Sequence, residues 1–277
     1  MEQVIICESI AENGDYELNE AKSLLESFRG ATRATIDTDE VGVLFSGGID
    51  STIIAILAAE ICDVKLYTVG VEGSYDMEAG RSAASSLGLE WHPIVITESE
   101  VVSAVRDMVA LTGNRNPVSL SFQIPMYFVS HNADQNLLVS GQGADELFAG
   151  YARYSTMSIS EKESQMTIDM AKLMEVTLHQ EQLIAAHHGK ELRYPFLHKD
   201  SVEAVNAIPL ERRVGYETSK ELLREVARLL NAGELAERKK KAAQYGSGAM
   251  RSLKAYAKRN GMTVRSMVAE MAVDEGA

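Results

Sequence analysis

At 277 residues, 45% of them hydrophobic, the chain is long enough for one large α/β domain or a core with a helical extension. It carries 27 Lys and Arg against 40 Asp and Glu, and a net charge of -13 argues against a general nucleic-acid binder. No stretch approaches the roughly 20 apolar residues that span a bilayer, no signal-peptide pattern is present, and two cysteines support neither a disulfide framework nor a metal cluster, so we expect a cytoplasmic protein.

The first 150 residues predict strands alternating with helices. The expected strands are short apolar runs, at 41–45, 64–71, 91–96 and 137–140. The expected helices show apolar residues at helical spacing, at 17–34, 51–61, 76–87, 98–111 and 125–132. Such alternation is typical of a doubly wound parallel sheet in an α/β fold.

From about Tyr151 onward the pattern predicts no strand. Helices are expected over 155–186, 218–231 and 248–272. The expected organisation is therefore an N-terminal helical extension (1–35), an α/β core (36–150), and a mainly helical C-terminal part (151–277) that packs on the core.

The segment Ser46-Gly47-Gly48-Ile49-Asp50-Ser51 leaves the strand at 41–45 and opens the next helix. In a doubly wound sheet, ligands bind at such a junction. The two glycines allow backbone N–H groups to approach an anion, and the helix N-terminus adds a favourable dipole. Ser46 and Ser51 add hydroxyl donors. Asp50 would repel a bare phosphate, but it fits if Mg²⁺ lies between them.

This loop lacks the lysine and the spacing of a Walker loop. It resembles the signature of the PP-loop ATP pyrophosphatases, which implies that it binds ATP, holds the departing pyrophosphate, and supports formation of an adenylate. The fold implied is adenine nucleotide α-hydrolase-like, which is Rossmann-like. A glycine-rich turn without a ligand is the alternative.

A second motif, Ser140-Gly141-Gln142-Gly143-Ala144-Asp145-Glu146, follows the strand at 137–140. It resembles the Ser-Gly-Glu-Gly-(Ser/Ala)-Asp-Glu motif in the synthetase domain of class II asparagine synthetases. The resemblance implies that Asp145 is a second Mg²⁺ ligand beside Asp50 and that Ser140 and Gly141 contact the nucleotide. By itself, an Asp-Glu pair after a glycine loop is also typical of a helix N-terminus.

The resemblance extends from about Val41 to Gly248. It places Val69 and Gly70 on the adenine side of the nucleotide and makes Leu44 a further nucleotide-binding residue. Glu191-Leu192-Arg193-Tyr194-Pro195-Phe196-Leu197 resembles the family's Glu-x-Arg-x-Pro-Phe-Leu segment.

The same resemblance implies roles for two lysines. Lys220 matches the lysine of the family's Lys-x-x-Leu-Arg helix, and Lys240 matches a lysine that stabilises charge on pyrophosphate. Together with Gln142 they are the candidate catalytic residues. The basic run at 238–241 is otherwise typical of a solvated face.

Three departures qualify the resemblance. Gln142 stands where the family has a glutamate, and an amide is not a useful base. His198 stands where the family usually has Asp, either as a structural or substrate-shaping change or as a new catalytic base. Residue 2 is Glu2 rather than the nucleophilic cysteine of the family's glutaminase half, so we expect free ammonia, a separate glutaminase subunit or another amine as the nitrogen source.

The leading hypothesis is an AMP- and pyrophosphate-forming amide ligase that uses ATP and Mg²⁺ and converts aspartate to asparagine. One alternative is a related ligase or cyclase acting on another carboxylate. A second is an inactive ATP-binding sensor or partner subunit. A homodimer is possible, whereas nucleic acid and membrane partners are not expected.

Overall fold

The computed structural model describes residues 2–214, 220–237 and 246–271, with side chains described from residue 18 onward except that of Ala236. In this part of the chain, five parallel strands form one sheet in the order β3-β2-β1-β4-β5. The strands are β1 (Glu40–Leu44), β2 (Asp63–Gly70), β3 (Glu90–Val95), β4 (Leu137–Val139) and β5 (Glu191–Arg193). The predicted doubly wound parallel sheet is confirmed.

The helices of the first half connect or precede the strands: α1 (Glu2–Thr35), α2 (Ile49–Ala59), α3 (Tyr75–Leu87), α4 (Glu98–Thr112), α5 (Pro117–Asn132) and α6 (Ala144–Leu147). Those of the second half are α7 (Ile159–Lys172), α8 (Leu178–His187), α9 (Lys199–Asn206), α10 (Leu210–Val214), α11 (Glu221–Leu229), α12 (Gly233–Ala236), α14 (Ala249–Arg259) and α15 (Val264–Met271). None of the helices in the described segments is long and apolar enough to cross a membrane.

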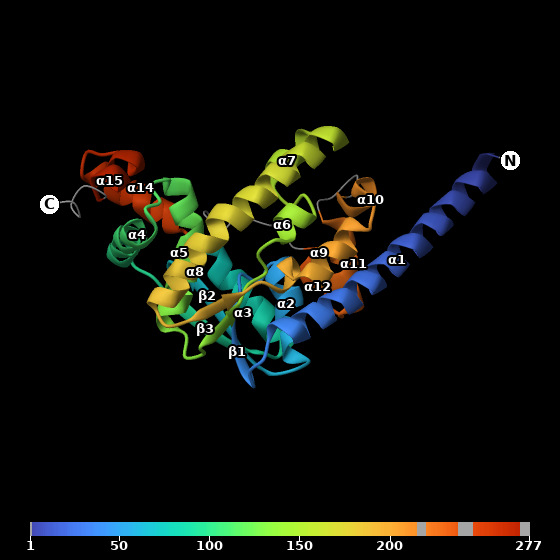
Figure 1. Ribbon diagram of the computed structural model, residues 1–277, viewed down its shortest axis with the longest axis horizontal. Coiled ribbons are helices and arrows are strands. Elements are labelled where there is room, and N and C mark those ends of the chain that lie inside the picture. Colours follow the sequence, from blue (N-terminus) through green and yellow to red (C-terminus); the bar gives the residue numbers. More distant parts are fainter. Residues whose placement is uncertain (1, 215–219, 238–245, 272–277) are drawn as a thin grey trace.

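Apolar side chains form a core on each face of the sheet. On one face, α1, α2 and α11 cover the strands, and Phe28 makes edge-to-face contacts with Phe148 and Phe196 at centroid distances of 6.5 and 5.0 Å. On the other face, α4, α5, α14 and α15 pack together. Figure 1 shows these two groups of helices at opposite sides of the sheet. Covering both faces explains why the central strands are continuous apolar runs.

The sheet changes winding direction between β1 and β4. The chain runs outward from β1 through β2 to β3, and it then returns to place β4 on the other side of β1. The loops that follow β1 and β4 lie next to each other at the carboxyl ends of these strands, which is where open α/β sheets bind ligands. The two predicted motifs therefore meet at this point of the fold.

The prediction of no strand after Tyr151 is wrong. β5 pairs with β4 in parallel register from Leu137 opposite Glu191 to Val139 opposite Arg193. The strand has three residues, of which Leu192 is buried, so it is too short to show a periodic pattern. Its position depends on the backbone of β4, which is a tertiary contact.

The predicted helix over 155–186 is also not one regular helix. A 3₁₀ turn (Ala152–Thr156) precedes α7, and a π-helical turn (Leu173–Thr177) separates α7 from α8. The helix predicted at 125–132 begins earlier, at Pro117. Asn116 caps it by accepting hydrogen bonds from the backbone N–H groups of Val118 and Ser119, and proline is favoured at the first helical position.

Candidate functional site

The loop at 46–51 lies between the end of β1 and the start of α2. Gly47 has φ of 70°, and a β-carbon there would lie 2.6 Å from the carbonyl carbon and oxygen of Ala79. Both the left-handed backbone and the close approach of α3 therefore require glycine. Gly48 occupies the N-cap position of α2, where it offers no side chain to the first N–H groups of the helix. Those groups are available to an anion.

The two serines of the loop hold it closed on itself. The Ser46 backbone N–H donates to the Ser51 hydroxyl at 3.3 Å, and the Ser51 hydroxyl donates to the Gly48 carbonyl at 3.1 Å. The Gly48 N–H in turn donates to the Ser46 hydroxyl at 3.3 Å. The loop is thus shaped before a ligand binds.

A buried lysine joins the two predicted metal ligands. The Lys220 Nζ donates to Asp50 Oδ1 and Oδ2 at 2.6 and 2.7 Å, and it lies 2.8 Å from Asp145 Oδ1. The Lys220 side chain is 3% exposed, against 18% for Asp50 and 20% for Asp145. The structure therefore brings Asp50, Asp145 and Lys220 together, although they are far apart in the sequence.

Glycines allow this close packing. A β-carbon on Gly141 would lie 2.9 Å from the Asp50 carbonyl carbon, so the two loops meet backbone to backbone there. A β-carbon on Gly150 would lie 2.0 Å from Asp145 Oδ1 and 2.1 Å from Lys220 Cε. Ser140 fixes the turn between them, because its hydroxyl accepts the Gln142 backbone N–H at 3.2 Å.

A small cavity of about 90 Å³ lies on one side of the loop pair. Leu44, Ser46 and Val69 line it, as do Asp76 and residues of β2 and α5. Gly70 lies beside it, where the Val71 backbone N–H donates to the Ser247 carbonyl at 2.9 Å. The residues predicted to bind the adenine side are thus gathered at one place.

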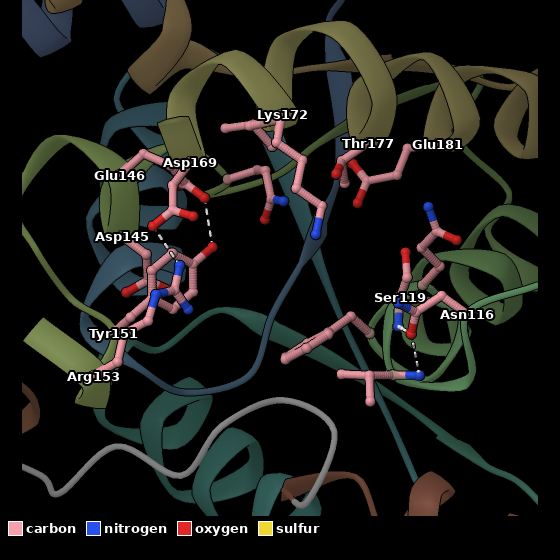
Figure 2. Close-up of a pocket in the computed structure, with 15 residues that line it drawn as sticks. Asn116, Ser119, Asp145, Glu146, Tyr151, Arg153, Asp169, Lys172, Thr177 and Glu181 are labelled. Carbon is pink, nitrogen blue, oxygen red and sulfur yellow. Dashed lines mark hydrogen bonds and ion pairs between the residues drawn. The ribbon is translucent and has the colours of Figure 1, made fainter. Parts of the chain in front are cut away.

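A larger cavity of about 320 Å³ lies beside the loop that follows β4 (Figure 2). Gln142 and Asp145 are the predicted residues that line it. The remaining lining residues were missed by the sequence analysis, and they include Asn116, Phe122, Glu146, Tyr151, Arg153, Asp169, Lys172, Leu173, Thr177 and Glu181. The π-helical turn supplies part of this wall, and such turns are frequent at functional sites.

Two buried acids line the larger cavity. Tyr151 donates its hydroxyl to Glu146 Oε1 at 2.5 Å, and burial raises the pKa of the Glu146 carboxyl although this hydrogen bond opposes the shift. Tyr194 donates to Glu181 Oε2 at 3.0 Å. Burial, together with repulsion from Glu146, raises the pKa of Glu181 to about 7. Glu181 therefore changes its protonation near neutral pH.

Replacing Glu181 with Gln is expected to reduce the pH dependence of stability. Because the folded-state pKa is raised above that of the unfolded chain, the stability that Glu181 contributes is present below about pH 4 and is lost as the pH rises through 7. The resulting fall in the free energy of unfolding is on the order of 3 kcal/mol. Urea denaturation at pH 5 and pH 8 measures it. The control Glu175→Gln, at an exposed position of the π-helical turn, should follow the wild type, and an equal pH slope in E181Q would contradict the assignment.

Arg153 and Asp169, which also line this cavity, form an ion pair. The Arg153 guanidinium stacks on the Tyr151 ring at 4.2 Å and pairs with Asp169. Burial alone would raise the pKa of Asp169, but hydrogen bonds from Tyr154, Arg153 and Gln165 lower it. Lys172, by contrast, has no hydrogen bond or ion pair with any residue that the structure describes.

Two predicted residues remain to be placed. Lys240 lies outside the described residues. His198 caps α9, because its Nδ1 accepts the Asp200 backbone N–H at 3.4 Å, so the structure gives it a local structural role.

The donor set at Asp50 and Asp145 suits Mg²⁺. No group of three or more His, Cys, Asp or Glu suited to a metal is found in the described segments. Mg²⁺, however, commonly takes one or two protein carboxylates and completes its shell with phosphate oxygens and water. The Lys220 ammonium pairs with both carboxylates and offsets one of their two negative charges.

Comparison with known proteins identifies the family. The chain matches the family model described as asparagine synthase over residues 23–167 and 160–271, and it therefore belongs to that family. It is 32% identical over 264 residues to a Methanocaldococcus jannaschii protein named "putative asparagine synthetase (glutamine-hydrolyzing) 1", and 31% identical over 229 residues to an asparagine synthetase (glutamine-hydrolyzing) of Cricetulus griseus.

These matches cover 81% and 76% of this chain but 49% and 40% of the relatives. The chain thus spans about half the length of the curated relatives it matches. Among solved structures, it is similar to an NMN synthetase from Francisella tularensis, with 14% identity, a TM-score of 0.44, and coverage of 92% of this chain and 91% of that one.

Proposed function

We propose that the chain is an ATP-dependent ligase that activates a carboxylate as an acyl-adenylate and then forms an amide. The observation that carries this proposal is the loop pair joined by Lys220, with a cavity beside each loop. Ser46 lines the small cavity, and Gln142 and Asp145 line the larger one. This arrangement suits an adenine on one side and a carboxylate on the other, with the α-phosphate between them.

The reaction has two steps. A carboxylate oxygen attacks the α-phosphorus of ATP, and the bond from that phosphorus to pyrophosphate breaks. An amine then attacks the acyl carbon, the bond to AMP breaks, and the amine loses a proton. The loop at 46–51 and the N-terminus of α2 bind the departing pyrophosphate, and the cavities position both reactants.

The metal and the two lysines have separate proposed roles. Asp50 and Asp145 would hold Mg²⁺, and the bound ion would neutralise negative charge on the phosphates. Lys220 lines neither cavity, so we assign it a positioning role for the two carboxylates. Lys240 remains the candidate that stabilises pyrophosphate.

The test measures release of AMP and pyrophosphate with ATP, Mg²⁺ and a carboxylate. Aspartate with ammonia is the first pair to test, because the relatives are asparagine synthetases. A separate glutaminase subunit would be an alternative nitrogen source. If no carboxylate supports AMP formation while ATP still binds, the ligase proposal is wrong, and the chain acts as an ATP-binding sensor or partner.

Replacing Gln142 with Glu is expected to increase aspartate turnover, by about 10-fold or more. Glutamate restores a carboxylate at the cavity wall that can pair with a substrate ammonium or accept a proton from the amine. AMP formation with aspartate and ammonia is the measurement. Gln180→Glu is the matched control, since Gln180 binds Asn114 and Gln123 rather than lining the cavity, and an equal gain there would refute a specific role for Gln142.

A further inference from the structure

The larger cavity has walls of different chemistry. Figure 2 shows Asp145, Glu146 and Arg153 on one side, Asn116 and Ser119 on the opposite side, and Lys172 extending from the helix above into the space between them. A ligand that reaches Asp145 and the loop pair therefore also comes within reach of the Lys172 ammonium.

The carboxylates of this cavity already have partners. Asp145 pairs with Lys220, and Asp169 pairs with Arg153. Glu146 and Glu181 accept hydrogen bonds from tyrosines. A substrate ammonium would have to share these carboxylates with their present partners, and Gln142 offers an uncharged amide where the asparagine synthetase motif has a carboxylate.

The two cationic side chains that line the cavity, Arg153 and Lys172, differ in their interactions with other residues. Arg153 is held by Asp169 and stacked on Tyr151. Lys172 is exposed and has no hydrogen bond or ion pair with any residue in the described part of the chain. An ammonium that points into a cavity without a partner is suited to bind an anionic group of the ligand.

Apolar side chains lie between the polar groups. Val118 and Phe122 are 48% and 40% exposed, and Leu173 lines the same cavity from the π-helical turn. A volume of about 320 Å³ is at the lower end of cavities that bind drug-sized ligands. The cavity thus offers space and apolar contact for a spacer.

We propose that the cavity selects a carboxylate that carries a second anionic group on an apolar spacer and no free ammonium, with Lys172 binding the second anion. This inference rests on the proposed ligase function and names the substrate class for it. It makes Lys172 a specificity-determining residue, and aspartate a poor substrate of the wild-type chain.

The experiment compares dianions with monoanions of equal length. Glutarate is tested against pentanoate and adipate against hexanoate, with aspartate as the zwitterion. Hydroxylamine replaces ammonia so that any acyl-adenylate is trapped as a hydroxamate. We expect kcat/KM to be about 10- to 100-fold higher for a dianion than for its matched monoanion, a difference that Lys172→Met erases and high salt reduces.

Lys172→Arg should restore the preference, since it keeps the charge, and Lys199→Met is the control, because Lys199 is exposed and lies outside the cavity lining. Equal use of monoanions and dianions by the wild type would overturn the inference while the ligase function stands. Retention of the dianion preference by Lys172→Met would also overturn the inference and leave the ligase function standing.

Equilibrium binding separates the two failures. Calorimetry measures adipate and hexanoate binding to the chain saturated with a non-hydrolysable ATP analogue. If no carboxylate gives a hydroxamate but adipate binds through Lys172, the anion site is present and the ligase function fails. If adipate binds no better than hexanoate, the anion site itself is refuted.

Discussion

Lys220→Met is expected to lower AMP formation by about 10²- to 10³-fold and the free energy of unfolding by about 3–5 kcal/mol. The ammonium lies within 2.8 Å of oxygens from both Asp50 and Asp145, and its side chain is 3% exposed. Methionine keeps the length but leaves two partly buried like charges facing each other. Because Lys220 touches neither cavity, kcat should fall more than KM for the carboxylate rises.

Urea denaturation and a pyrophosphate-release assay measure the two effects. Lys65→Met is the matched control: the partly exposed Lys65 ammonium lies 3.8 Å from an oxygen of the exposed Asp134, so its loss should cost about 0–1 kcal/mol. If the Lys220 variant does not fold, Asp50→Asn tests the same cluster, since Lys220 keeps Asp145. Full activity of the Asp50→Asn variant would refute the role assigned to the loop pair.

Gly150→Ala is expected to destabilise the chain by about 1–3 kcal/mol and to abolish most AMP formation. The new methyl group would occupy space 2.0 Å from Asp145 Oδ1 and 2.1 Å from Lys220 Cε, so the ion cluster must open to admit it. The substitution removes no charged group, so a loss of activity reports on the geometry of the cluster.

Thermal denaturation and the same assay check this result against Gly30→Ala. A β-carbon on Gly30 meets nothing within 4 Å, and Gly30 lies inside α1, so alanine there should stabilise the chain by about 0.5–1 kcal/mol. The two alanine substitutions thus have opposite expected signs. A Gly150→Ala variant as active and stable as wild type would show that the cluster tolerates a shift.

The strand, loop and helix around residues 46–51 could be predicted because their signals are local. An apolar run before Ser46 indicates a strand, the glycines mark a sharp turn, and the apolar spacing after Ser51 indicates a helix. The start of α5 was missed although Asn116-Pro117 is a recognisable helix N-terminus. The N-terminus of α5 is therefore encoded locally and does not depend on tertiary structure.

Other features had no local signal. β5 has only three residues, and its position depends on hydrogen bonds to β4. Lys220 adopts a left-handed backbone with φ of 61° that nothing in its sequence neighbourhood requires. The π-helical turn carries Leu173 and Thr177 to the cavity, whereas a regular helix was predicted there. Each of these depends on packing between distant segments.

The sequence by itself determined the family resemblance, the parallel sheet and the loop at 46–51, because periodicity, glycine placement and short motifs encode them over a few residues. Only the tertiary structure decided the ion cluster around Lys220 and the composition of the larger cavity. Its walls come from α5, the loop after β4, α7 and α8, and the partners of each charged group depend on how those segments pack. The position of the Lys172 ammonium, which has no partner among the residues that the structure describes, is therefore a property of the fold.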